Sequence, residues 1–174
     1  MNPAPRDMSI HSTDPFATPE GERSPLRRLR GRLAAPVVLW TAPGPAGLTV
    51  SSTLIVDGDP GRVLGLLDDE SELWAAIEAA GRFALVPLRP ADRQLADRFA
   101  GLLPAPGGLF ATGDWRDTGY GPVPADAATW AGCRLDAARP VGWALLVEAT
   151  VERVELGTAD EPLVHYRGRY HELR

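Results

Sequence analysis

The sequence contains no lysine, and all 18 of its basic residues are arginine. This absence excludes a lysine Schiff base and a phosphate loop of the Walker type, because both depend on the lysine amine. Cys133 is the only cysteine, which excludes an intrachain disulfide and a cysteine-based metal cluster, and we expect no metal site. Because Cys133 alternates with apolar residues after Trp130, we predict a buried, inert thiol.

Long apolar runs are also missing. The longest run, Leu33–Trp40, is too short to span a bilayer, and no signal peptide precedes it. The net charge of −5 argues against a nucleic-acid-binding surface, because such a surface needs clustered cations to neutralise phosphates. The sequence therefore predicts a cytoplasmic protein that binds neither membranes nor nucleic acids.

The 174 residues fit one domain preceded by a tail. Residues 1–23 are rich in proline and polar residues and lack apolar periodicity, so we expect a tail that is disordered, or ordered only against a partner. Ser24 and Pro25 are typical of a helix start, so the domain is expected over residues 24–174.

The first helix of that domain is predicted to be amphipathic. Leu26, Leu29 and Leu33 lie at helical spacing with arginines around them. The simpler interpretation is a short helix with a solvated basic face. The alternative is a basic patch that recognises an anionic cofactor.

Beyond residue 36, apolar alternation and turn residues predict a mainly β chain. Strands are expected at 37–40, 48–56, 62–67, 83–88, 130–137, 142–156 and 162–170, and further helices at 71–80 and 92–102. The stretch 103–128 is rich in Gly, Pro and Asp, which predicts a long functional or interfacial loop. Short strands and helices in mixed order indicate a closed Greek-key β-barrel with helices at its ends.

Four stretches together resemble the flavin reductase-like family, the reductase partners of two-component flavin monooxygenases. They are GLTVSS at 47–52, GRFALV at 81–86, LADRFAG at 95–101 and PLVHYRGRY at 162–170, in the order and spacing of the family. The resemblance covers the chain from about residue 26 onward. It implies a flavin reductase-like split barrel that binds FMN, a homodimer with the flavin near the subunit interface, and a nicotinamide cofactor that delivers hydride to the flavin.

Given this resemblance, the first candidates for flavin binding are the hydroxyl residues at the end of the second predicted strand. Thr49, Ser51, Ser52 and Thr53 supply hydroxyl and backbone N–H groups that suit the polar edge of a flavin without adding charge. The alternative is that these hydroxyls only decorate an exposed strand face. No catalytic side chain is assigned, because the two cofactors carry the hydride transfer and the protein orients them.

Ser71 lies where the family places Ser and Thr at a helix start that favours phosphate. Leu73 replaces the expected threonine, and carboxylates crowd the turn 68–72. A phosphate at this turn would need an arginine nearby, such as Arg82, Arg89 or one from the basic helix. The alternative is a plain helix cap with no ligand.

The last predicted strand supplies further candidates that rest on the resemblance. Arg169 is a candidate to pair with an anionic cofactor, and His165 or Tyr170 to flank the flavin ring or the nicotinamide. The alternative is an exposed strand with solvated arginines and packed tyrosines. Trp115, in the long loop, is a candidate to cover a bound ring, while Trp143 replaces a histidine that many relatives place near the nicotinamide.

These features predict an NAD(P)H-dependent flavin reductase that reduces FMN or FAD and supplies the reduced flavin to a monooxygenase or to oxygen. The acidic turn and the replaced histidine leave two alternatives open. One is a split-barrel protein without reductase activity that binds flavin, deazaflavin, haem or a regulatory ligand. The other is an interaction subunit that has lost its ligand.

Overall fold

The computed structural model describes residues 24–158 and 161–173, so the predicted disordered tail lies outside the described residues. The strands are β1 (Ala35–Pro36), β2 (Val38–Ala42), β3 (Ala46–Val50), β4 (Leu54–Val56), β5 (Arg62–Leu67), β6 (Arg82–Pro87), β7 (Trp115–Asp117), β8 (Pro122–Pro124), β9 (Trp130–Val141), β10 (Ala144–Glu155), β11 (Leu163–Tyr166) and β12 (Arg169–Glu172). The helices are α1 (Pro25–Gly31), α2 (Glu72–Ala80), the 3₁₀ turn η3 (Pro90–Asp92) and α3 (Arg93–Phe99). The described chain is therefore mainly β with short helices, as predicted.

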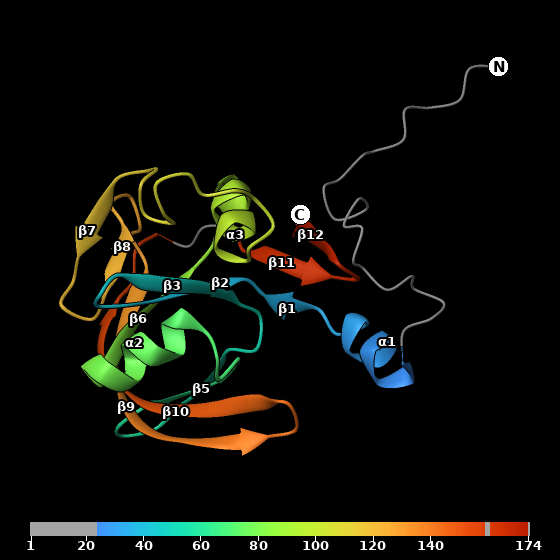
Figure 1. Ribbon diagram of the computed structural model, residues 1–174, viewed down its shortest axis with the longest axis horizontal. Helices are drawn as coiled ribbons and strands as arrows, with labels where there is room; N and C mark the ends of the chain where they lie inside the picture. Colours follow the sequence, from blue (N-terminus) through green and yellow to red (C-terminus); the bar gives the residue numbers. More distant parts are fainter. Residues whose placement is uncertain (1–23, 159–160, 174) are drawn as a thin grey trace.

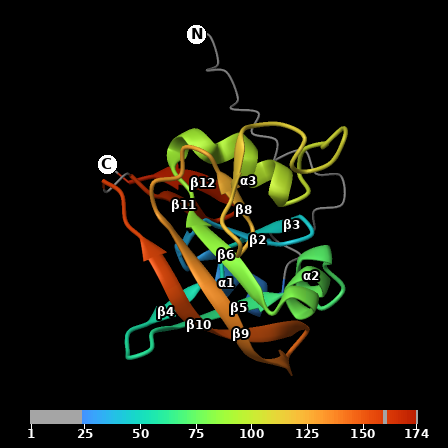
Figure 2. The ribbon, with the colours of Figure 1, turned by 90° about the vertical axis from the view of Figure 1, so that its left-hand side faces the viewer.

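A seven-stranded antiparallel sheet in the order β3-β2-β6-β9-β10-β5-β4 forms the body of the molecule (Figure 1). Strands distant in sequence are neighbours, since β2 pairs with β6 and β5 with β10, as Greek-key connections require. The sheets β1-β11-β12 and β7-β8 flank this body. Figure 2 shows the long strands running diagonally between α3 above them and the β4–β5 hairpin below.

Strand β2 is buried along its whole length because it has a hydrophobic cluster on each face. Trp40 points into the first cluster, where its indole ring stacks on Phe83 with ring centroids 4.5 Å apart. Leu39 points into the second cluster with Phe99 of α3. Gly65 completes the first cluster, because a Cβ atom there would lie 2.5 Å from the Trp40 ring.

Two predicted strands are each divided in the structure. The strand expected at 48–56 becomes β3 and β4, because the chain leaves the sheet at Ser51–Thr53. The strand expected at 162–170 is the hairpin β11–β12. Its turn places Arg167 and Gly168 at φ angles of 51° and 78°, the left-handed pair typical of a type I′ hairpin. The stretch 103–128, expected to be loop, also carries the short pair β7–β8.

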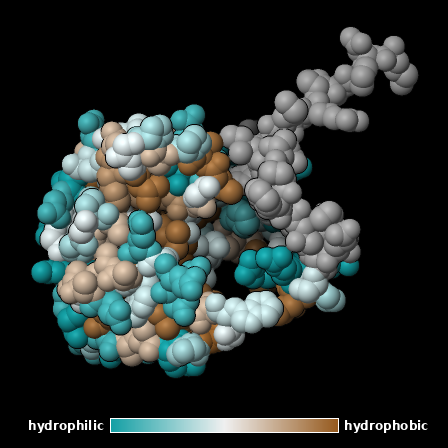
Figure 3. Space-filling view, viewed as in Figure 1, coloured by the Kyte–Doolittle hydropathy of each residue, from teal (hydrophilic) through white to brown (hydrophobic). Residues whose placement is uncertain are grey.

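Helix α1 begins as predicted and lies apart from the barrel (Figure 1). The Ser24 hydroxyl accepts a hydrogen bond from the Arg27 N–H, and Pro25 is the first helical residue. None of the residues of α1 is buried, and Leu26 and Leu29 are 75% and 58% exposed. Figure 3 shows an open gap between α1 and the lower strands of the barrel. No helix in the described part of the chain is long and apolar enough to cross a membrane.

Cys133 is fully buried in the first cluster, which confirms the predicted buried thiol. Burial, with a smaller contribution from Glu152, raises the pKa of the Cys133 thiol to about 12. At pH 8 only roughly one thiol in ten thousand is then ionised. We expect native protein to stay unlabelled by Ellman's reagent at pH 8 and to react with one equivalent in denaturant. Stoichiometric labelling of the native protein would contradict the buried position.

Candidate functional site

The segment Ser51–Thr53 joins β3 to β4 and takes part in no strand ladder. Two of its side chains fasten it to the barrel. The Trp40 indole N–H donates to the Thr53 hydroxyl at 2.9 Å. The Ser52 hydroxyl accepts from the Leu66 N–H at 3.0 Å and donates to the Leu66 carbonyl at 3.1 Å. Ser51 is exposed, and its hydroxyl bonds to none of the described residues.

Thr49 lies outside this segment and has a different role. Its hydroxyl donates to the Ala96 carbonyl at 2.7 Å and so joins β3 to α3. Of the four hydroxyls predicted to face a flavin, those of Thr49, Ser52 and Thr53 are therefore bonded within the barrel. The Ser51 hydroxyl and the backbone of the segment are the polar groups that remain available to a ligand.

The sheet register brings two other predicted features next to this segment. Ser52 is bonded to Leu66, which directly precedes the last residue of β5, and the acidic turn 68–72 follows. Leu145 pairs with Leu67, so the tip of the β9–β10 hairpin lies beside the same turn (Figure 1). Trp143, at that tip, is fully exposed. The hydroxyl segment, the start of α2 and the residue that replaces the family histidine thus gather at one end of the barrel.

Ser71 is the N-cap of α2. Its hydroxyl accepts from the Trp74 N–H at 3.2 Å and donates to the Asp68 carbonyl at 2.7 Å. The Asp68 carboxylate in turn accepts from the Glu70 N–H at 2.9 Å. These bonds account for the serine and the first acid of the turn without a ligand, which is the arrangement of a plain helix cap.

The two arginines proposed to assist a phosphate lie away from Ser71 or are already paired. Arg82 follows the C-terminal end of α2, about 13 Å from its start for a helix of nine residues. Arg89 pairs with Asp92 at 2.9 Å and with Asp126 at 2.7 Å. The charge at the acidic turn is therefore not offset by Arg82 or Arg89.

His165, Arg169 and Tyr170 lie together on the β11–β12 hairpin, which pairs with β1 and contacts α3. Burial and a hydrogen bond with Asp97 of α3 raise the pKa of Tyr170 well above its usual value. The His165 ring meets the Tyr170 ring edge-on at 5.9 Å, and Arg169 is exposed. Arg93 of α3 donates to the Tyr170 carbonyl at 3.0 Å. These contacts make the hairpin a packed element beside α3.

Trp115 of β7 is half-buried in the second cluster. Its ring lies 4.7 Å from Phe110 and 5.6 Å from Phe99, and its indole N–H donates to the Thr112 carbonyl at 3.2 Å. Gly47 of β3 lies against the same rings, because a Cβ atom there would come within 2.6 Å of Phe99. Trp115 is thus held by three neighbours on the α3 side of the barrel.

Sequence reasoning missed the part that Trp40 plays at the site. In the sequence it is one apolar residue within a hydrophobic strand. In the structure it fills the first cluster and holds Thr53 at its indole N–H. A tryptophan in a core strand signals burial, but it does not signal which loop the indole N–H will reach.

Comparison with known proteins agrees with the barrel. Nitrilotriacetate monooxygenase component B of Mycobacterium thermoresistibile superposes with a TM-score of 0.77 and 27% identity, over 86% of this chain and 85% of that chain. FMN reductase (NADH) RutF of Variovorax paradoxus is 29% identical over 95% of this chain and 93% of its own length. RutF 2 of Methylorubrum extorquens, also an FMN reductase (NADH), is 32% identical over 93% of this chain and 94% of its own length.

These structural neighbours define the class of the fold as the flavin reductase split barrel. Residues 30–174 match the flavin reductase like domain, and the chain belongs to this family. The predicted fold and family are therefore confirmed. The relatives are flavin reductases, which agrees with the function that the resemblance implied.

Proposed function

We propose that this chain is a flavin reductase that passes hydride from NAD(P)H to FMN or FAD. The observation that carries the proposal is the segment Ser51–Thr53, which the family match includes. Ser52 and Thr53 bond the segment to β5 and to Trp40. The Ser51 hydroxyl and the backbone N–H and C=O groups that pair with no strand are therefore held in a fixed position, where a ligand can reach them. Such fixed neutral donors suit the polar edge of a flavin ring.

When bound, the flavin and the nicotinamide supply the hydride transfer. The chain's own residues bind and orient them, and no acid or base among the described side chains is required. We infer that Trp143, exposed at the hairpin tip beside the segment, offers an aromatic face where relatives place a histidine. His165, Tyr170 and Trp115 are proposed to flank the bound rings from the α3 side, with Arg169 available to an anionic group.

The test is steady oxidation of NADH or NADPH by the purified protein when free FMN or FAD is added. We expect sustained turnover, followed as loss of reduced-nicotinamide absorbance, and no turnover without added or bound flavin. A yellow protein that turns over neither nucleotide would contradict the reductase and favour a flavin-binding protein without this activity. A colourless protein with no affinity for FMN would favour an interaction subunit.

The acidic turn gives a prediction about flavin choice. Two like charges about 4 Å apart repel by about 1 kcal/mol in water, so a phosphate gains little beside uncompensated carboxylates. We expect riboflavin to bind nearly as well as FMN in fluorescence-quenching titrations. Neutralising the turn with Asp69→Asn and Glu70→Gln should raise the affinity for FMN about fivefold while leaving riboflavin unchanged.

Ser71→Ala provides the control for that experiment. It should lower the free energy of unfolding by about 1 kcal/mol through loss of the α2 cap, without altering the ratio of FMN to riboflavin affinity. A large preference of the unaltered protein for FMN would contradict a turn that repels phosphate, and would restore Ser71 as a phosphate ligand.

We propose that the protein is a homodimer, because α1 buries no side chain against the described chain and is held to it at Gly31, whose carbonyl accepts from the Arg167 N–H at 3.0 Å. A seven-residue helix is too short to be stable alone, yet α1 buries none of its residues. Its leucines and the outer strand β4, whose residues are all exposed, supply unpaired apolar surface. A second copy seated there would bury both.

A monooxygenase component is among the structural neighbours, and we propose that a partner oxygenase receives the reduced flavin from this chain. The transfer would be tested by coupling the protein to an oxygenase. Because free reduced flavin reacts readily with oxygen and forms hydrogen peroxide, catalase is included to remove the peroxide. We place this exchange in the cytoplasm, where the reduced nicotinamides are made.

A further inference from the structure

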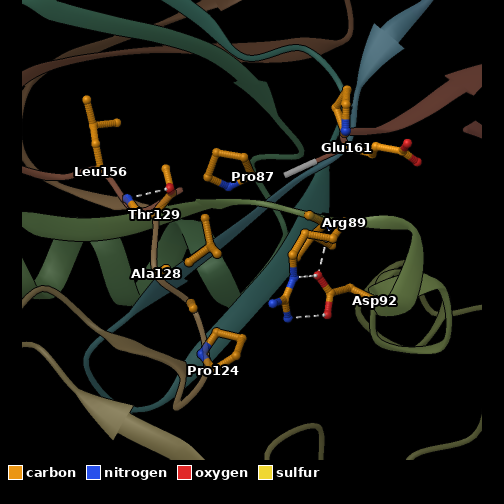
Figure 4. Close-up of a pocket in the computed structure, with 13 residues that line it drawn as sticks. Pro87, Arg89, Asp92, Pro124, Ala128, Thr129, Leu156 and Glu161 are labelled. Carbon is orange, nitrogen blue, oxygen red and sulfur yellow. Dashed lines mark hydrogen bonds and ion pairs between the residues drawn. The ribbon is translucent and has the colours of Figure 1, made fainter. Parts of the chain in front are cut away.

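A pocket of about 370 Å³ lies away from the predicted flavin site. It is built where β6 ends, the β8–β9 connection passes and β10 ends (Figure 4). Arg89, which the sequence offered as one possible helper for a phosphate at the acidic turn, lines it, but the hydroxyl residues at 49–53, Ser71 and Trp143 do not. Most of its wall is apolar and comes from Leu88, Pro124, Ala127, Ala128, Leu156 and Pro162. Its volume is at the small end of ligand pockets, which suits a molecule of one or two rings.

Arg89 is the one cation among the residues that line the pocket. Its Nε donates to Asp92 Oδ2 at 2.9 Å, and its Nη2 donates to Asp92 Oδ1 at 3.1 Å and to Asp126 Oδ2 at 2.7 Å. Its Nη1 bonds to no residue in 24–158 or 161–173. Figure 4 shows Asp92 on one edge of the guanidinium and the other edge turned toward Pro124 and Ala128. The carboxylates thus fix the guanidinium, while the Nη1 edge keeps its N–H donors available to a ligand.

The charges around Arg89 restrict the kind of ligand that this pocket can bind. Asp92 and Glu161 line the pocket with Arg89, and Asp126 pairs with it from outside. Two carboxylates already pair with the one guanidinium and Glu161 adds a third acid to the pocket lining, so the surroundings disfavour a further anion. A cationic ligand is also disfavoured, because the N–H donors of Nη1 need an acceptor and a cation supplies none. A neutral acceptor on an apolar body satisfies both the donors and the walls.

We propose that this pocket binds a small, neutral ring compound whose carbonyl oxygen accepts a hydrogen bond from Nη1 of Arg89. The apolar wall contacts the ring, and the planar guanidinium fixes its orientation. The site is separate from the flavin site and does not depend on the proposed reductase activity. It gives the protein a place for a neutral aromatic ligand alongside the flavin.

Three probes that share one ring test the proposal: acetophenone, benzoate and benzylamine. Binding is measured by saturation-transfer NMR with the protein held in excess FMN, so that the flavin site is not open to the probes. We expect saturable binding of acetophenone, and binding of benzoate and benzylamine at least about tenfold weaker, the size of one hydrogen bond to a charged donor. No saturable binding of acetophenone in excess FMN, or equal binding of the three probes, would overturn the proposal.

Two variants locate the bound probe. Arg89→Lys keeps a cation for Asp92 and Asp126 but removes the planar fork, and should weaken acetophenone binding about tenfold. Ala128→Leu adds bulk at an exposed position of the wall and should weaken it similarly by filling space. Arg98→Lys, at a partly exposed arginine outside the pocket, is the control and should leave binding unchanged. If Arg89→Lys and Ala128→Leu have the melting temperature of the parent protein and still bind acetophenone as tightly, the proposal is overturned.

Discussion

Replacing Leu29 with glutamate should convert a dimer into a monomer. Leu29 is 58% exposed on α1, a helix that buries no residue against its own chain. Fully burying one leucine contributes about 1.5–3 kcal/mol, and in a symmetric dimer each substitution removes that contribution twice. The introduced carboxylate must also be desolvated. Together these costs are expected to shift the dissociation constant by at least about a hundredfold.

The measurement is light scattering on a sizing column at micromolar protein. Arg28→Glu introduces the same charge on the arginine side of α1 and serves as the control, which should remain dimeric. A monomeric parent protein, or a Leu29→Glu variant that stays dimeric, would contradict the proposed interface.

Trp40→Ala should have the largest effect on stability of any single truncation in the barrel. The Trp40 side chain is fully buried and its ring stacks on Phe83. The ring also packs against Gly65, where a Cβ atom would come within 2.5 Å of it. Truncating a buried tryptophan typically costs about 3–5 kcal/mol, a large part of the 5–15 kcal/mol that stabilises a domain. The variant also loses the hydrogen bond that holds Thr53, so flavin affinity should fall with stability.

Urea unfolding followed by circular dichroism measures the loss. Trp143→Ala is the matched control, since Trp143 is fully exposed and its truncation should change the free energy of unfolding by less than about 0.5 kcal/mol. Similar losses for the two tryptophans would contradict the assignment of Trp40 to the core and of Trp143 to the surface.

Local signals in the sequence predicted the elements whose ends are fixed by their own residues. Ser24 and Pro25 begin α1 as expected. Ser71 caps α2, and Gly81 ends it at a φ angle of 68°, the left-handed conformation that glycine adopts without strain. The central strands also lie where their apolar patterns predicted them, because a strand that is buried on one or both faces needs apolar residues at the buried positions.

Features that depend on distant residues were not predicted. Residues 48–56 are predicted as one strand across the polar run Ser51–Thr53, and the break there becomes evident only when Trp40 and Leu66 supply its hydrogen bonds. The β9–β10 pairing contains register shifts at Glu148/Ala149 and between Val151 and Arg153, which change the face that each strand buries. A strict alternation cannot reveal such a bulge, because its position is set by the partner strand.

The candidate site was predicted in part. The resemblance identified the segment 51–53, the turn at Ser71 and the position of Trp143, and the structure brings these three together at one end of the barrel. The sequence did not reveal that Ser52 and Thr53 use their hydroxyls internally, because those bonds join residues 13 and 14 positions apart. Which residues contact the flavin and the nicotinamide stays a prediction.

The sealed position of Cys133 makes the protein convenient for spectroscopy. The native thiol is buried and protonated, so a thiol-reactive dye would find no background target on the folded protein. A cysteine introduced at Glu72, which is exposed at the start of α2, would then carry the dye alone. The absence of lysine removes side-chain amines as competing targets. A single reporter beside the proposed flavin site would follow flavin arrival and departure in real time, without removing any native residue of the core.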